Sequence, residues 1–466
     1  MSFNEPIFFV FLGTLVAAFS VLRRVSARSA LLLLLVASAG FYAYREPAHL
    51  SLLAATTALA FLAGRLISGE DQRRNAWILG ISVGLLLLPL LVFKYSGFLL
   101  SAVLGPHSAA MPPELIQAGL VLPLGISFFT FQNTGYVVDR FRSHLNGERS
   151  AVKYALYIAF FPQLVAGPIV AARDFLPQLA NQTFFHNRDF ILGGTFLLLG
   201  YCKKALLADS LASVVDPAFA NAGTVGGAAL WIAVVGYAMQ IYFDFSGYSD
   251  IAIGVGLWFG FRLPENFNYP YSAGSFRDFW RRWHITLSRW LRDQLYIPLG
   301  GSRHGAARMH FALFATMALG GLWHGAHWNF LIWGMGHGSL LILERWIPER
   351  WLARPVFSGT YRVVVLACIV LLWIPFRAGS EPGGLALTWT IFERLFTLVP
   401  GEFSEAGLRV VVGALLLLGV GSVWGERLFA WWNSVGLVAR GCLLAAGVIV
   451  LLCVAPGGSG FIYFVF

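Results

Sequence analysis

Residues 78–92 read Ile78-Leu-Gly-Ile-Ser-Val-Gly-Leu-Leu-Leu-Leu-Pro-Leu-Leu-Val92, a run without a single charged side chain. Similar apolar runs recur on both sides of it, at Ile7–Leu22, Leu31–Tyr44, Leu50–Gly64, Leu115–Val138, Val363–Trp373, Val410–Val423 and Leu443–Val454. A helix that crosses the hydrocarbon core of a bilayer needs about 20 apolar residues, so the chain has room for about 10–12 transmembrane or re-entrant helices. The predicted fold class is therefore an all-α polytopic membrane protein.

The composition supports this class. Hydrophobic residues make up 58% of the 466 residues and charged residues 12%, about half the share of charged residues in a soluble domain. The net charge of +10 does not indicate nucleic-acid binding, because basic residues in a membrane protein mark cytoplasmic loops. Clusters of this kind follow alternate runs, at Arg23 and Arg24, at Arg73 and Arg74, and near Arg140. We expect a multi-pass protein of the bacterial inner membrane with a periplasmic N-terminus.

Three zones are distinguished within a single membrane domain, residues 1–466. Residues 1–140 and 360–466 contain conventional spans, whereas residues 150–345 carry many His, Gly, aromatic and basic residues between short apolar segments. Polar segments at membrane depth persist only when they are buried in protein or line a wet cavity. The middle zone therefore predicts a cavity, amphipathic helices at the interface with membrane lipids, or both.

One amphipathic helix is predicted within residues 275–301, a segment that begins Ser275-Phe-Arg-Asp-Phe-Trp-Arg-Arg-Trp-His-Ile-Thr-Leu-Ser-Arg-Trp-Leu291. Ser275 is expected to cap it, and the run Pro298-Leu-Gly-Gly301 is expected to end it. Aromatic and apolar residues recur at helical spacing along one stripe, and His284 falls on a polar flank. The segment is interpreted either as a surface anchor or as a platform for a phosphorylated cofactor. The candidate phosphate-binding residues are Arg281, Arg282, Arg289, Arg292 and Arg303.

A second unusual segment, residues 319–338, contains His324, His327, Asn329 and His337 within apolar sequence. Polar side chains in a membrane span usually face a bundle interior or a cavity, and histidine is neutral near pH 7. We expect His324, Asn329 and His337 to face a central cavity, although a histidine here is equally consistent with a hydrogen bond between packed helices. The histidines lack HExxH spacing and the four cysteines form no CxxC pair, so no metal site is predicted.

These two segments together resemble the signature of the membrane-bound O-acyltransferase family. They are Phe279-Trp-Arg-Arg-Trp-His284-Ile-Thr-Leu-Ser288 and Leu322-Trp-His324-Gly-Ala-His-Trp-Asn329. The polysaccharide-modifying branch, which includes alginate O-acetyltransferases and D-alanyl transfer proteins, is also similar at Leu122–Phe131, Phe161–Pro168, Gln240–Asp250 and Pro264–Tyr271. The resemblance covers residues 30–377 and implies a ring of tilted helices around a central funnel.

The resemblance also implies a chemistry. Acetyl-CoA is the expected donor, with its phosphates on the basic helix, and an exported polysaccharide such as alginate or cellulose is the expected final acceptor. His324 corresponds to the catalytic histidine and is the candidate general base. His284 corresponds to the second active-site position, and His284 or Asn329 is expected to donate a hydrogen bond to the oxyanion. A periplasmic SGNH-type acetyltransferase and the exopolysaccharide machinery are the expected partners.

The chain ends Gly457-Gly-Ser-Gly-Phe461-Ile-Tyr463-Phe-Val-Phe466. The end is interpreted either as an aromatic belt at the membrane interface or, by resemblance to the D-alanylation system, as an acyl acceptor. In the second interpretation Tyr463 accepts the acyl group as a phenol ester and passes it to an extracytoplasmic partner.

Four charged residues of the middle zone are given structural roles. Asp244 and Asp250 are expected to form hydrogen bonds within the bundle, and Lys203 and Lys204 are expected to mark a membrane interface.

Two rival functions stay open. A proton-coupled transporter or flippase would use membrane histidines as a relay, and another member of the same family would acylate a lipid or a protein. Neither rival accounts for the paired Trp-His motifs together with the alginate-like segments and the tyrosine tail.

Overall fold

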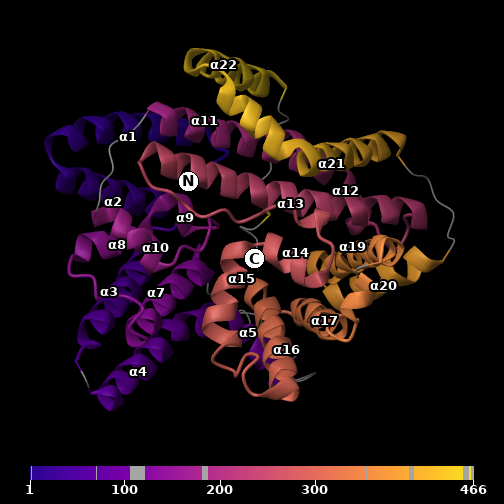
Figure 1. Cartoon of the computed structure of the whole chain (residues 1–466), viewed down its shortest axis with the longest axis horizontal. Helices are drawn as coiled ribbons and strands as arrows, with labels where there is room; N and C mark the ends of the chain where they lie inside the picture. The colour runs from indigo at the N-terminus through magenta and orange to yellow at the C-terminus, as the bar shows by residue number, and fades with distance from the viewer. Residues whose placement is uncertain are drawn as a thin grey trace. The chain divides into compact units, whose positions relative to one another are not determined.

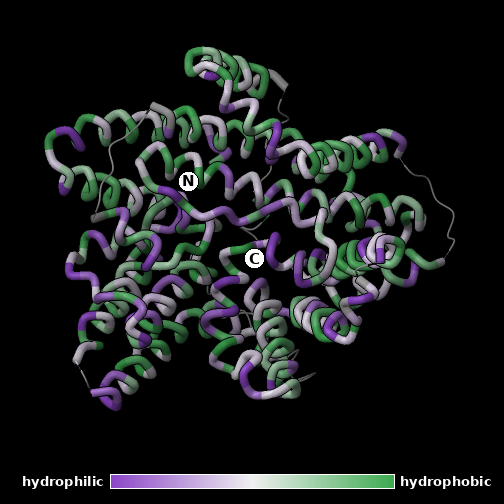
Figure 2. The backbone as a smooth tube through the Cα atoms, in the orientation of Figure 1, coloured by the Kyte–Doolittle hydropathy of each residue, from purple (hydrophilic) through white to green (hydrophobic). Residues whose placement is uncertain are grey.

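The structure is a computed structural model that describes residues 1, 3–69, 71–104, 121–180, 187–352, 354–381, 383–397, 404–454 and 461–462. All the regular secondary structure among these residues is helical, and turns and loops join the helices. Helices satisfy their backbone hydrogen bonds internally, which is what a chain with this apolar content needs inside a bilayer. Figure 2 shows apolar residues along the helices and polar residues gathered mainly at helix ends and connections.

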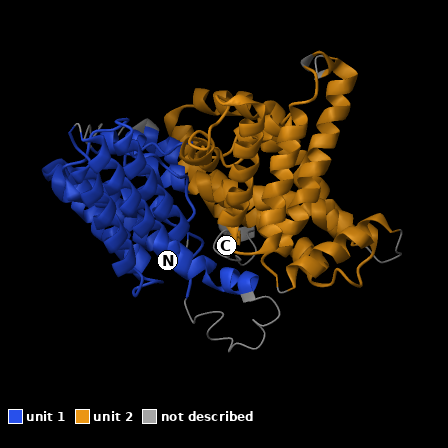
Figure 3. Cartoon of the chain, turned by 90° about the horizontal axis from the view of Figure 1, so that it is seen from below, with its two compact units in different colours: residues 1–193, 252–264 blue, residues 194–251, 265–466 orange. Residues whose placement is uncertain are grey.

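The chain divides into two compact units, coloured separately in Figure 3. Unit 1 comprises residues 1–193 and 252–264, and unit 2 comprises residues 194–251 and 265–466. Two helices, α11 and α13, contribute residues to both units.

Unit 1 contains the helices of the N-terminal zone (Figure 1). Its elements are α1 (Pro6–Val25), α2 (Ala27–Ala43), α3 (Leu50–Leu66), α4 (Gln72–Leu90), a π-helix η1 (Leu91–Tyr95), α5 (Ser96–Leu104), α7 (Ile126–Phe141), α8 (Ala151–Ala159), α9 (Phe161–Leu164), α10 (Ala172–Ala180) and the first part of α11 (Asn187–Tyr201). Helix α7 packs against both α3 and α4. The packing is close where Gly64 meets the ring of Tyr136, because a Cβ atom at Gly64 would lie 2.3 Å from that ring.

Unit 2 contains the remaining elements. They are the π-helix η3 (Cys202–Ala208), α12 (Asp209–Ala220), α13 (Gly227–Trp258), η4 (Pro270–Ser272), α14 (Phe276–Arg282), α15 (Ile285–Leu291), η5 (Arg292–Tyr296), α16 (Gly305–His324), α17 (Trp328–Glu344), α18 (Glu349–Leu352), α19 (Pro355–Ala378), α20 (Gly384–Phe396), α21 (Glu405–Ser434) and α22 (Leu437–Val454). Helices α16 and α17 form an extensive antiparallel pair, and α17 also packs against α19.

The apolar runs of the sequence correspond to helices. Among the described residues, six helices are long and apolar enough to cross a membrane: residues 6–25, 72–103, 189–220, 227–258, 355–378 and 405–434. Three further apolar helices, residues 27–43, 50–66 and 437–451, are shorter. The all-α polytopic class is confirmed, whereas the count of about 10–12 spans or half-spans stays a prediction. Part of the run Leu115–Val138 lies outside the described residues, and helix α7 begins at Ile126.

Candidate active site

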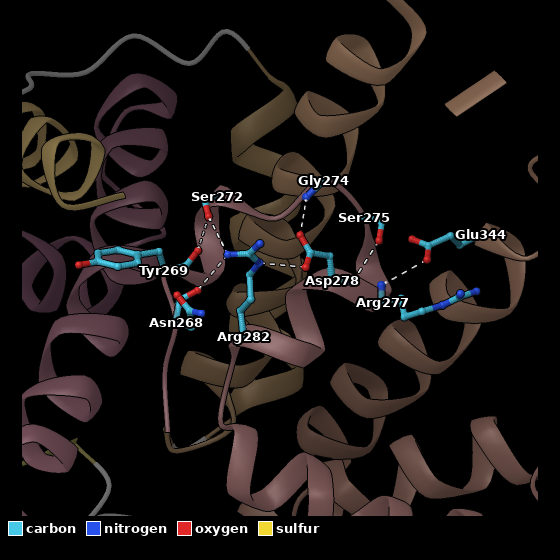
Figure 4. A network of polar contacts seen from close by, with 9 residues as sticks. All are labelled: Asn268, Tyr269, Ser272, Gly274, Ser275, Arg277, Asp278, Arg282 and Glu344. Atoms are coloured by element: carbon cyan, nitrogen blue, oxygen red, sulfur yellow. Dashed lines mark hydrogen bonds and ion pairs between the residues drawn. The ribbon is translucent and has the colours of Figure 1, made fainter. Parts of the chain in front are cut away.

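Helix α14 is anchored at its N-terminus by two side chains, which Figure 4 shows together. Ser275 caps the helix as expected, since its hydroxyl accepts a hydrogen bond from the Asp278 backbone N–H at 3.0 Å. The carboxylate of Glu344, at the end of α17, accepts from the backbone N–H groups of Phe276 at 2.5 Å and Arg277 at 3.3 Å. A carboxylate satisfies the unpaired N–H groups of a helix start and opposes the positive end of its dipole. Glu344 therefore fixes where α14 begins relative to α17.

Arg282 holds the other end of α14. Its Nε atom donates to Asp278 at 2.9 Å, and its terminal nitrogen lies 3.4 Å from the Asn268 carbonyl oxygen and from the Ser272 hydroxyl. Figure 4 shows the guanidinium between these groups. Much of the guanidinium's hydrogen-bonding capacity is thus used inside the protein, in a role that ties α14 to the segment before it.

The prediction of a single helix from Ser275 to the Pro298-Leu-Gly-Gly301 run is wrong, because the chain breaks at His284. His284 has φ of 41°, a left-handed conformation that is uncommon for a residue with a side chain. The preceding segment takes over backbone groups at the break: the Asn268 N–H donates to the Arg282 carbonyl and the Ile285 N–H donates to the Asn266 carbonyl, both at 2.9 Å. Tertiary hydrogen bonds to residues 266–268 therefore replace those that a continuous helix would make.

The break turns His284 into the protein rather than onto a polar flank, and its side chain is fully buried. Its Nδ1 atom lies 3.1 Å from Oδ1 of Asn266. The same oxygen accepts from the backbone N–H and the hydroxyl of Thr286, at 3.3 Å and 2.9 Å. A backbone N–H is always a donor, so the Asn266 atom that it meets is the carbonyl oxygen and cannot donate. The proton on the neutral His284 ring consequently sits on Nδ1 and leaves a lone pair on Nε2.

This tautomer decides what His284 can do. Burial lowers the pKa of His284 to about 3, so the ring is neutral at physiological pH. Its Nε2 atom is buried and has no hydrogen-bond partner among the described residues. The neutral ring therefore offers an acceptor for an O–H or N–H group. The expected donation to an oxyanion would require a protonated ring, which this environment disfavours.

His324 is the last residue of α16 and is 3% exposed. Its ring lies among aromatic neighbours, with centroids 4.8 Å from Trp323, 5.2 Å from Trp333 and 5.0 Å from Phe376. A second helix approaches closely near His324, at Gly321, where a Cβ atom would lie 2.2 Å from the Phe330 carbonyl oxygen of α17. His324 is thus held where two helices are in backbone contact.

Trp323 connects the two candidate active-site histidines. Its ring centroid is 6.0 Å from His284 and 4.8 Å from His324. His337 joins the same aromatic cluster through Trp333, at 4.9 Å. The structure therefore brings the predicted histidines together, from α16, α17 and the α14–α15 break.

Asn329 has a different environment. It is buried at the start of α17, and its amide nitrogen donates to the Thr388 hydroxyl of α20 at 2.9 Å. A Cβ atom at Gly379, between α19 and α20, would lie 3.2 Å from the Asn329 side chain. These contacts favour a structural role for Asn329 in joining α17 to α20.

The candidate phosphate-binding arginines lie on the exposed side of the same region. Arg281, Arg289, Arg292 and Arg303 are exposed, and Arg282 is partly buried. Arg292 forms an ion pair with Asp293 at 2.8 Å. The guanidinium groups of Arg292 and Arg282 are thus each already paired with a carboxylate. Binding of a phosphorylated cofactor by this group stays a prediction.

The interface role predicted for the two lysines is wrong. Both lie in the middle of the helical stretch formed by α11, η3 and α12. Lys203 pairs with Asp250 at 2.6 Å, and the buried Lys204 lies 2.8 Å from Asp244 and 2.9 Å from Asp209. Charged residues inside apolar sequence usually find partners in the bundle, and that rule was the available signal for these pairs.

Tyr463 lies outside the described residues, but the two residues before it do not. The ring of Phe461 is 1% exposed, and the backbone N–H of Ile462 donates to Asp244 at 2.9 Å. This portion of the chain end is therefore bound within unit 2.

Comparison with known proteins points in the same direction as these motifs. A model of the membrane-bound O-acyltransferase family (MBOAT) matches residues 76–379. The probable alginate O-acetylase AlgI of Azotobacter vinelandii is 39% identical over 414 residues, which cover 86% of this chain and 81% of that protein. A peptidoglycan O-acetyltransferase of Helicobacter pylori is 36% identical over 82% of this chain and 78% of its own length. A teichoic acid D-alanyltransferase of Streptococcus thermophilus is 27% identical over 60% of this chain and 67% of its own length.

Proposed function

Since the chain belongs to the membrane-bound O-acyltransferase family, we propose that it takes acetyl groups from cytoplasmic acetyl-CoA and passes them across the membrane for O-acetylation of an exported polysaccharide. The protein is a multi-pass membrane O-acyltransferase. The acetyl group and the polysaccharide are inferred from relatives that are named as alginate and peptidoglycan O-acetylating enzymes. The arginines that follow alternate apolar runs support a location in the inner membrane with a periplasmic N-terminus.

The observation that carries this proposal is the burial of His324 and His284 around the ring of Trp323. A neutral imidazole held beside a reacting hydroxyl can accept its proton as a general base. In the proposed reaction, the hydroxyl oxygen of the acceptor attacks the thioester carbonyl carbon and its proton moves to His324. The carbon–sulfur bond then breaks, and the departing thiolate takes that proton from His324 to give coenzyme A.

His284 has a supporting role in this proposal. Its Nε2 lone pair orients an O–H or N–H group of one of the substrates, while Asn266 holds the ring in place. The exposed guanidinium groups of Arg281 and Arg303 support this role for the basic segment, because a guanidinium binds phosphate by paired hydrogen bonds.

Tyr463 is the proposed first acceptor. A phenol ester keeps more transfer potential than an alkyl ester, so a second transfer to a sugar hydroxyl can still run downhill. The bound positions of Phe461 and Ile462 support a chain end that works inside the protein rather than at the membrane surface. A periplasmic SGNH-type acetyltransferase or a similar protein would then complete the transfer to alginate, cellulose or a related polymer.

Mass spectrometry of the intact protein after exposure to acetyl-CoA tests this function. The wild type is expected to gain one acetyl group, and Tyr463→Phe and His324→Ala are expected to gain none. His310→Ala, a histidine on the same helix α16, is the matched control and is expected to behave as the wild type. Full acetylation of Tyr463→Phe would refute the relay, and normal acetyl transfer by His324→Ala would refute the assigned base.

An assay in sealed vesicles distinguishes the proposed enzyme from the rival transporter. A carrier would accumulate substrate without breaking the thioester, whereas the proposed enzyme releases coenzyme A in proportion to acetyl transferred. Acetylated lipid or protein as the final product, without acetylated polysaccharide, would favour the other members of the family.

A further inference from the structure

Three charged side chains form a buried cluster in unit 2. The ammonium of Lys204 lies 2.8 Å from an oxygen of Asp244 and 2.9 Å from an oxygen of Asp209. The side chains are 3%, 1% and 6% exposed, in that order. Lys204 comes from the π-helix η3, a type of distortion that is frequent at functional sites. The cluster contains two carboxylates and one ammonium, so it has an excess of acceptor oxygens in a buried place.

The end of the chain supplies complementary groups to this cluster. The second carboxylate oxygen of Asp244 accepts the backbone N–H of Ile462 at 2.9 Å. The ammonium of Lys204 lies 4.8 Å from the centre of the Phe461 ring, within the range of a cation–π contact. The same ring forms a T-shaped contact with Tyr248 of α13, with ring centroids 5.2 Å apart. Two consecutive residues are thus recognised by a carboxylate, an ammonium and an aromatic ring.

The contacts specify what the cluster binds. Leaving a buried carboxylate oxygen without a hydrogen-bond donor costs far more free energy than leaving an exposed one without a donor. The cluster therefore favours a bound N–H group. The ammonium and Tyr248 select an aromatic side chain immediately before that N–H. The matching ligand class is a peptide with an aromatic residue followed by any residue except proline, which lacks the N–H.

We infer that Lys204, Asp209, Asp244 and Tyr248 form a receptor for the C-terminal segment, which we call the tail receptor, and that it holds this segment in place for acyl transfer. The inference rests on the proposed function, because the held residues directly precede Tyr463 in the sequence. In this view Asp244 and Lys204 are positioning residues: they act through the tail and take no part in breaking the thioester.

The neighbouring pair, Lys203 and Asp250, provides a matched control. It joins the same two elements, η3 and α13, at 2.6 Å. No hydrogen bond, ion pair or ring contact joins this pair to the described residues 461–462. Removing the charge of Asp250 therefore breaks a neighbouring, partly buried pair without changing a residue of the tail receptor.

The test compares full-length Asp244→Asn and Asp250→Asn in detergent. The first readout is the release of C-terminal residues by a carboxypeptidase, which requires no catalytic activity. Loss of one charge-assisted hydrogen bond is expected to speed release by about 10- to 100-fold in Asp244→Asn, with Asp250→Asn close to the wild type. The second readout is acetylation of Tyr463, expected to fall by a similar factor in Asp244→Asn alone.

A variant of the C-terminal segment itself tests whether misfolding of the helices explains the result. Ile462→Pro removes the donor N–H and leaves the receptor intact, whereas Ile462→Val keeps both. Ile462→Pro is expected to reproduce the faster release, and Ile462→Val is expected to match the wild type.

The outcomes separate the two proposals. Unchanged release in both Asp244→Asn and Ile462→Pro, or equal acceleration in Asp244→Asn and Asp250→Asn, would overturn the tail receptor. A third outcome is faster release of C-terminal residues in Asp244→Asn together with no acetylation of Tyr463 in the wild type. That outcome would support the tail receptor and refute the acyl relay through Tyr463.

Discussion

Replacing Gly321 with alanine is expected to damage the active site without altering any chemical group in it. Gly321 lies where α16 contacts α17, and an added Cβ atom would lie 2.2 Å from the Phe330 carbonyl oxygen and 3.0 Å from Gly334. Ordinary contact begins near 3.4 Å, so the two helices must separate locally by about 1 Å. Backbone cannot yield as a flexible side chain does, and overpacking of this kind destabilises a protein by about 1–3 kcal/mol.

The displacement also reaches His324, the proposed general base. His324 follows Gly321 within one helical turn, and its ring is held by Trp333 of α17 at 5.2 Å. A misplacement of about 1 Å costs on the order of 100-fold in rate. Acetyl transfer from labelled acetyl-CoA is therefore expected to fall about 100-fold in Gly321→Ala, with a lowered midpoint of thermal unfolding in detergent.

Gly320→Ala is the control for this prediction. A Cβ atom at Gly320 would meet only the end of the Leu291 side chain, at 3.1 Å, and that side chain can move. Gly320→Ala is expected to keep most of its activity. Activity of Gly321→Ala within twofold of the wild type, or an equal loss in Gly320→Ala, would refute the claim that backbone contact between α16 and α17 positions His324.

Two further predictions concern the fixed ring of His284. Asn266→Leu removes the oxygen that holds the ring and is expected to lower kcat on the order of 100-fold, whereas Asn266→Asp keeps an acceptor and is expected to retain much more activity. Equal kcat losses would show that Asn266 acts through packing alone. The folded protein depresses the pKa of His284 from 6.5 to about 3, so this residue's contribution to stability is complete above pH 6.5 and declines as the pH falls toward 3. The thermal midpoint should therefore drop less between pH 7 and pH 5 in His284→Gln than in the wild type, and an equal drop would exclude His284 as the source.

The helices and the family of this protein could be predicted from the sequence because both depend on local patterns. An apolar run such as Ile78–Val92 must be helical in a bilayer, where no water satisfies the backbone. The Trp-His motifs around His284 and His324 singled out the two rings that the fold places on either side of Trp323. The N-terminal cap at Ser275 was also predictable, since it depends on residues three positions apart.

The errors share one cause, which is a partner distant in the sequence. Residues 275–291 have the periodicity of one helix, yet backbone groups of Asn266 and Asn268 compete successfully at the break. The lysines at 203 and 204 resemble an interface pair until the aspartates of α13 are seen beside them. The hydrogen bond between Glu344 and the start of α14 joins residues that are 68 positions apart. No rule based on residue spacing predicts such a pair.

By itself, then, the sequence determined that this chain is a helical membrane protein, and its motifs singled out the histidines that the fold places around Trp323. Tertiary structure alone decided which atom of His284 carries a proton and which charges are buried together. It also showed that part of the chain end is bound inside. The physical reason is that apolar periodicity is a property of neighbouring residues, whereas a tautomer, an ion pair or a docked segment depends on groups that only folding brings within bonding distance.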